Sequence, residues 1–178
     1  MGRSSGLPVS PVEARPSPIP FRTVNRVGTW GYDGGMQRHH LLPRQLLTVK
    51  SLQPMLMQLG REAIGFDDFR TNGLLLPCAE QASLKTGLPL HRGPHRHYNA
   101  AVIERAGAIE RAWSLHRGKH PDDARHHAIA SLRLLQNALR KRLLAERRRM
   151  ILNRNDPIGT GFDFTELDAM AEAMWAAD

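Results

Sequence analysis

Cysteine is almost absent from this chain of 178 residues, because Cys78 is the only one. A single thiol can form neither an intrachain disulfide framework nor a zinc site built from several thiolates. Long apolar runs are also missing, and no stretch approaches the roughly 18 residues that a transmembrane helix requires. We therefore expect no membrane partner. Aromatic residues make up 6% of the chain, so the core is predicted to consist mainly of Leu, Ala, Ile and Met.

Acidic residues are outnumbered by basic ones, 17 against 25, which gives a formal net charge of +8 and a pI of about 10.7. A basic protein favours polyanionic partners, and nucleic acid is the first of these. The N-terminal residues lack the apolar core of a signal peptide. We expect the protein to be cytoplasmic as synthesised, and export by a specialised secretion system is compatible with this expectation.

The composition divides the chain into three parts. Proline recurs through the first 22 residues, and it fixes φ and removes a hydrogen-bond donor. Residues 1–24 are therefore predicted to be a flexible arm or linker. Residues 25–150 are predicted to form one domain that ends in a basic helix. Residues 151–178 are predicted to form a loop and a short amphipathic helix.

Two short strands are predicted inside the central domain. The first approaches through a glycine-rich turn and ends at His39 and His40. The second is the apolar run 74–76, which is too short for a helix and is bounded by Gly73 and Pro77.

Helical periodicity marks three further segments. The first runs from Leu46 to Leu59, with Pro54 starting or kinking the helix and Gly60 as its C-cap. The second begins with Pro94 in its first turn. The third begins at Pro121, and its apolar stripe is Ala128, Leu132, Leu135, Leu139 and Leu143. The fold class predicted from these elements is α+β and mostly helical.

Three motifs in fixed order carry the chemistry. They are His39-His40-Leu41-Leu42-Pro43, then Asn72-Gly73-Leu74-Leu75-Leu76-Pro77, then His91-Arg92-Gly93-Pro94-His95-Arg96-His97-Tyr98. Phosphodiester hydrolysis needs charge neutralisation at the phosphate, a base for the attacking water and stabilisation of the leaving oxygen. A divalent cation covers the first and third needs, and a neutral imidazole covers the second. Adjacent residues of a strand point in opposite directions, so the two neighbouring histidines can take different roles.

Across residues 28–115 the three motifs resemble the AHH branch of the HNH and endonuclease VII nucleases, a ββα-metal superfamily. The resemblance implies a small two-stranded hairpin beside a metal-bearing helix. It implies that His39 and His95 bind metal, that His40 is the general base, and that Asn72 orients this base or the loop beside it. His91 takes the place of a metal ligand, but Gly93 and Pro94 interrupt the helix there, so a substrate contact is the alternative.

The alanine that gives the branch its name is replaced by Arg38, which either contacts phosphate or crowds the site. Further phosphate contacts are predicted for Arg92 and for the basic end of the third helix, Arg147, Arg148 and Arg149. For the latter three, complementing the helix dipole is the competing interpretation.

The sequence thus predicts a metal-dependent endonuclease with little sequence specificity, acting on DNA, with RNA as the alternative substrate. Its cofactor would be Mg²⁺, Mn²⁺ or Zn²⁺. The resemblance also implies a bacterial toxin effector neutralised by an acidic immunity protein. Two other classes remain open at this point: a non-catalytic nucleic-acid-binding protein on a nuclease-like fold, and a basic interaction or scaffold protein.

Overall fold

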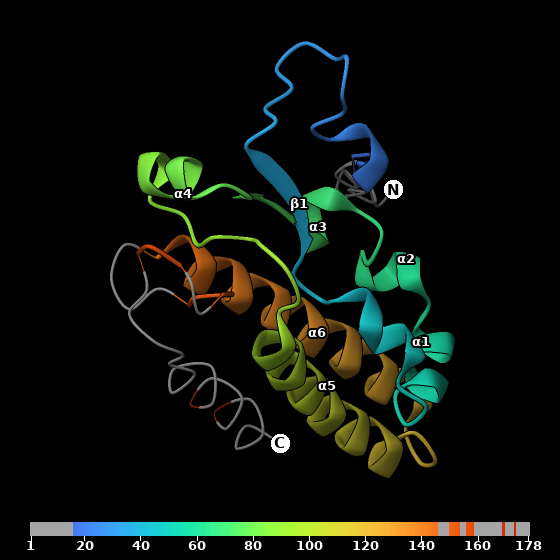
Figure 1. The fold of residues 1–178 in the computed structure, drawn as a ribbon. Coiled ribbons are helices and arrows are strands. Elements are labelled where there is room, and N and C mark those ends of the chain that lie inside the picture. Colours follow the sequence, from blue (N-terminus) through green and yellow to red (C-terminus); the bar gives the residue numbers. More distant parts are fainter. Residues whose placement is uncertain (1–15, 146–149, 154–155, 159–168, 170–172, 174–178) are drawn as a thin grey trace, which may run out of the picture.

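The computed structural model describes residues 16–145, 150–153, 156–158, 169 and 173, and it has the predicted α+β, mostly helical fold (Figure 1). Short helical turns surround a two-stranded hairpin, and two long helices lie beneath it. The elements in chain order are η1 (Phe21–Thr23), β1 (Met36–His40), η2 (Arg44–Thr48), α1 (Gln53–Leu59), α2 (Arg61–Ile64), α3 (Phe69–Asn72), β2 (Gly73–Pro77), α4 (Glu80–Thr86), α5 (Arg96–His116) and α6 (Pro121–Leu144).

The hairpin joins segments that are far apart in the sequence. Strands β1 and β2 are antiparallel, and their register runs from Met36 opposite Pro77 to His40 opposite Gly73. Both predicted strands are confirmed. The register places the two adjacent histidines at the end of the hairpin that faces the long helices.

Helices α5 and α6 lie side by side and form the floor of the molecule (Figure 1). The predicted apolar stripe of α6 is buried along its whole length. It packs against Val102, Ile109 and Trp113 of α5 and against the residues that follow β1. Burial of apolar side chains contributes on the order of 25 cal/mol per Å², so this layer stabilises the fold. The hairpin packs against this layer.

Two predicted helix boundaries differ from those in the structure. Leu46 lies in the separate 3₁₀ helix η2, and α1 begins only at Gln53, with Pro54 in its first turn and Gly60 as its C-cap as expected. Helix α5 begins at Arg96 and not at Pro94. His95 is its N-cap, with a non-helical φ of −97° and ψ of 59°.

Part of the segment predicted to be a flexible arm or linker contacts the rest of the fold. Pro20 forms an isolated bridge with Asp68, and the amide of Phe69 donates to the Ile19 carbonyl at 2.7 Å. These partners are distant in sequence, so local composition does not reveal them. Within the described part of the chain, no helix combines the length and apolar character that crossing a bilayer requires.

Candidate metal centre and active site

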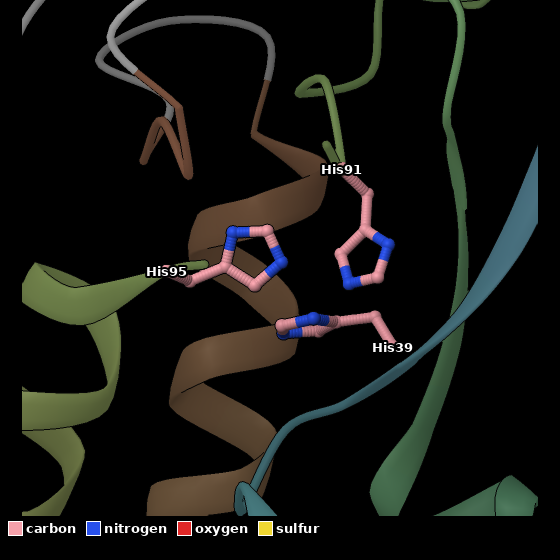
Figure 2. Close-up of side chains that lie close together, drawn as sticks. All are labelled: His39, His91 and His95. Carbon is pink, nitrogen blue, oxygen red and sulfur yellow. The ribbon is translucent and has the colours of Figure 1, made fainter. Parts of the chain in front are cut away.

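Three histidines from three different elements converge beside the hairpin (Figure 2). His39 comes from β1, His91 from the loop after α4, and His95 from the residue that precedes α5. Each offers one ring nitrogen, and these nitrogens all lie within 4.8 Å of one another. The sequence placed the same three residues in a metal site, and the structure brings them together.

The position of each imidazole follows from its local backbone. His39 is buried, and its ring meets the edge of Tyr98 at a centroid distance of 5.0 Å. The Tyr98 hydroxyl donates to the Leu41 carbonyl at 2.7 Å, which ties α5 to the end of β1. The His91 amide donates to the Pro77 carbonyl at 2.7 Å, so the loop that carries His91 returns to the end of β2.

The donor atoms fit a metal ion. Nε2 of His39 is buried and has no hydrogen-bond partner among the described residues. A buried polar atom without a partner costs free energy, and cation binding would remove that cost. Nδ1 of His91 lies 3.2 Å from Oε1 of Gln37. When this nitrogen donates to Gln37, the Nε2 lone pair is free to bind a metal, and the ring orientation is fixed.

Electrostatics keeps the three rings neutral. Burial lowers the pKa of His39 well below its usual value, and the neighbouring His91 and His95 lower it further. Burial, then the charges of His95 and His40, lower the pKa of His91 to about 4. Burial also lowers the pKa of His95, while a hydrogen bond to the main chain of Leu152 acts in the opposite direction. Metal ligation requires neutral imidazole, so these shifts favour binding at physiological pH.

His40 lies apart from the cluster, as the alternation of side chains along β1 requires. Its ring stacks on Phe21 at a centroid distance of 3.8 Å. Burial, followed by the charge of Arg44 and that of Arg38, lowers the pKa of His40 to about 4, while Asp67 acts in the opposite direction. The imidazole is therefore neutral at physiological pH and able to accept a proton.

Asn72 is fully buried at the end of α3. Its Oδ1 accepts from the Leu42 amide at 2.7 Å, and its Nδ2 donates to the Phe66 carbonyl at 2.9 Å. Gln136 of α6 donates to the same Oδ1 at 3.2 Å. The side chain thus holds the loop that leaves the histidine strand. Gly73 follows because a Cβ there would lie 2.2 Å from the Phe69 ring.

The predicted phosphate-binding arginines have different surroundings. Arg38 is exposed, and its Nη1 donates to the Phe21 carbonyl at 2.9 Å and the Val24 carbonyl at 3.3 Å. Arg92 is exposed between two of the histidines and lies 3.8 Å from Glu80. The basic residues Arg147, Arg148 and Arg149 lie outside the described residues.

Sequence reasoning missed Gln37, Phe21 and Arg44. Strand alternation was the signal that could have found Gln37, because residues two apart on a strand share a face. This places Gln37 beside His39. No comparable local signal exists for Phe21, which lies 19 residues before the histidine that it contacts.

The fold and site together define a class of protein. An antiparallel hairpin presents one histidine to a cluster that is completed just before a helix, and this is the fold of a ββα-metal nuclease. The model of the AHH family, described as a nuclease family of the HNH/ENDO VII superfamily with conserved AHH, matches residues 20–139. The chain belongs to this family and is a nuclease, although Arg38 stands in place of the alanine. Comparisons with curated proteins and with solved structures gave no significant match.

Proposed function

We propose that the protein is a metal-dependent endonuclease that hydrolyses phosphodiester bonds in DNA with little sequence specificity. The observation that carries the proposal is the convergence of ring nitrogens from His39, His91 and His95 within 4.8 Å. Nε2 of His39 is buried without a partner among the described residues. A purely structural histidine cluster would leave that cost uncompensated.

His39, His91 and His95 would hold the divalent cation. When bound, it would neutralise the phosphate charge and stabilise the leaving oxygen. Imidazole donors suit Zn²⁺ and other late transition metals, whereas Mg²⁺ prefers oxygen ligands. We therefore expect Zn²⁺ to bind more tightly than Mn²⁺, and Mn²⁺ more tightly than Mg²⁺.

His40 acts as the general base. Its neutral ring accepts a proton from the attacking water, and the exposed Arg44 beside it favours an approaching phosphate. Asn72 contributes indirectly, by holding the Leu42 main chain two residues after His40. His40 and His39 are adjacent in sequence but occupy opposite sides of the strand, so proton transfer and metal binding are separated.

Substrate affinity comes mainly from phosphate contacts, which carry no sequence information. Arg92 is exposed within the loop that holds two of the histidines, and the chain as a whole carries a net charge of +8. Binding of DNA should therefore weaken steeply with salt. The same charge favours an acidic inhibitor, so a toxin effector paired with an acidic immunity protein is consistent with this proposal.

A plasmid-nicking assay tests the proposal. Supercoiled DNA is incubated with protein pretreated with EDTA, and Mg²⁺, Mn²⁺ or Zn²⁺ is then added back. We expect cleavage only with added metal, and cleavage by the His40→Ala variant should be slower by roughly 10²–10⁴-fold. Undiminished cleavage in excess EDTA would refute the metal mechanism. A parallel assay with single-stranded RNA shows whether DNA or RNA is the substrate. Stoichiometric metal binding without cleavage of DNA would favour a non-catalytic nucleic-acid-binding protein.

A further inference from the structure

The imidazole of His40 forms a parallel stack with the phenyl ring of Phe21. The ring centroids are 3.8 Å apart, and the ring planes differ by 2°. Phe69 meets Phe21 edge-on at 5.1 Å and 76°, and Phe66 lies 6.5 Å from His40 on a tilted plane. A parallel stack covers the face of the imidazole and not its edge, where both nitrogens lie. The contact therefore restrains the plane of the His40 ring, and it does not cover either ring nitrogen.

Arg38 holds Phe21 in place from the histidine strand itself. Its guanidinium donates to the carbonyls of Phe21 and Val24 at 2.9 and 3.3 Å. Because Arg38 and His40 are two residues apart on β1, their side chains lie on the same face of the strand. An alanine, which the family pattern has at this position, has no donor that could reach these carbonyls.

Residues 19–24 are also held at their N-terminal end, where Ile19 bonds to Asp68 and Phe69. The Ile19 amide donates to Oδ1 of Asp68 at 2.9 Å, and the Phe69 amide donates to the Ile19 carbonyl at 2.7 Å. The Phe69 ring lies close over Gly73, the residue paired with His40 across the hairpin. The aromatic stack is thus anchored to both strands.

We infer that Phe21 and Arg38 are positioning residues for the nuclease reaction. Phe21 fixes the plane of the His40 imidazole, and Arg38 keeps Phe21 against that ring. The terminal torsion of histidine is intrinsically broad, so an unstacked ring would sample several orientations. Misplacement of a catalytic group by about 1 Å can cost on the order of 10²-fold in rate. This inference rests on the proposed role of His40 as general base.

Nuclear magnetic resonance of metal-free protein with isotope-labelled histidine tests the stack directly. The His40 signals are assigned from their loss in His40→Ala. We expect the ring protons of His40 to be shifted upfield by the adjacent phenyl ring. The shift should disappear in Phe21→Leu, decrease in Arg38→Ala and persist in Phe21→Tyr. Trp30→Leu and Arg22→Ala are matched controls, because they remove an exposed aromatic ring and an exposed cation from the same region, and both should keep the shift.

Steady-state kinetics of DNA cleavage tests the consequence for the reaction. Phe21→Leu and Arg38→Ala should lower kcat by about 10-fold to 10²-fold, less than the roughly 10²–10⁴-fold expected for loss of a general base. In both variants KM and the metal affinity measured by calorimetry should be unchanged. Phe21→Tyr keeps an aromatic ring at this position and should retain the wild-type kcat. A Phe21→Leu protein that is folded by its amide spectrum and loses the shift but keeps full kcat would overturn the inference.

Two other outcomes also count against it. Absence of the upfield shift in the wild-type protein would show that the stack does not form in solution. Absence of nuclease activity in the wild-type protein would overturn the proposed function and with it the positioning role. In that case the histidine spectrum would still report the stack, so the two failures are distinguishable.

Discussion

The side chain of Asn72 holds the main chain of Leu42 through both of its polar groups. Oδ1 accepts from the Leu42 amide at 2.7 Å, and Nδ2 donates to the Leu42 carbonyl at 3.2 Å. This pair of bonds replaces a strand partner at the point where β1 ends. The direction in which the chain leaves His40 therefore depends on one buried amide.

Replacement of Asn72 by alanine should destabilise the protein. The Leu42 amide would lose its partner in a buried setting, and each buried polar group left unsatisfied costs about 1–3 kcal/mol. We expect the free energy of unfolding, measured by urea denaturation, to fall by at least this amount. Asn99→Ala is the control, because Asn99 bonds to Gln45 at the surface, and its effect should stay within about 0.5 kcal/mol. Equal effects of the two substitutions would contradict this role for Asn72.

Gln37 is expected to tune the metal site without binding metal. Its Oε1 lies 3.2 Å from Nδ1 of His91, and loss of such an outer partner typically lowers metal affinity about 10–100-fold. Gln37→Leu should show this decrease in a calorimetric titration with Zn²⁺. Gln45→Leu removes a surface glutamine that bonds to Asn99 and not to a histidine of the cluster, and it should leave the affinity unchanged. An unaltered affinity in Gln37→Leu would show that His91 needs no such support, or that it does not bind the metal.

Local patterns predicted the parts of the site that lie on single elements. Gly73 and Pro77 bounded the second strand correctly. The His39-His40 pair marked the end of the first strand, because such signals act over a few residues.

Contacts between distant segments account for what the sequence did not reveal. Proline content indicated a flexible arm or linker over residues 1–24 and did not reveal that Ile19 bonds to Asp68, 49 residues later. Arg38 was expected to contact phosphate or to crowd the site, and the sequence did not reveal that its guanidinium bonds to main-chain carbonyls of residues 21 and 24. Composition reports the intrinsic preference of a segment, whereas these bonds depend on which surface the folded chain places beside it. The start of α5 was shifted for a local reason, because His95 takes a non-helical conformation as its N-cap.

Metal binding and proton transfer should separate by mutation. His39→Ala and His95→Ala each remove one of three clustered donors, so both should weaken Zn²⁺ binding and cleavage together. His40→Ala should leave Zn²⁺ affinity nearly intact and lower kcat by roughly 10²–10⁴-fold. Calorimetric titration and cleavage assays on the same preparations compare the three variants. A His40→Ala protein that no longer binds metal would reverse the assignment of the two adjacent histidines.

The metal-free protein should lose stability as the pH falls from about 6.5 to about 4. The pKa values of His40 and His91 are lowered to about 4 in the folded state, chiefly by burial, whereas an unfolded histidine titrates near 6.5. Between these values the unfolded chain binds protons that the folded chain does not, so acidification favours unfolding. Below about 4 the folded rings are protonated too, and their contribution to the pH dependence ends.

Urea denaturation in EDTA across this range should show the decline. His91→Gln should flatten it, while His126→Ala, which removes an exposed histidine, should not. A stability that stays constant from pH 6.5 to 4 would mean that the buried imidazoles titrate normally and that burial does not hold the cluster neutral.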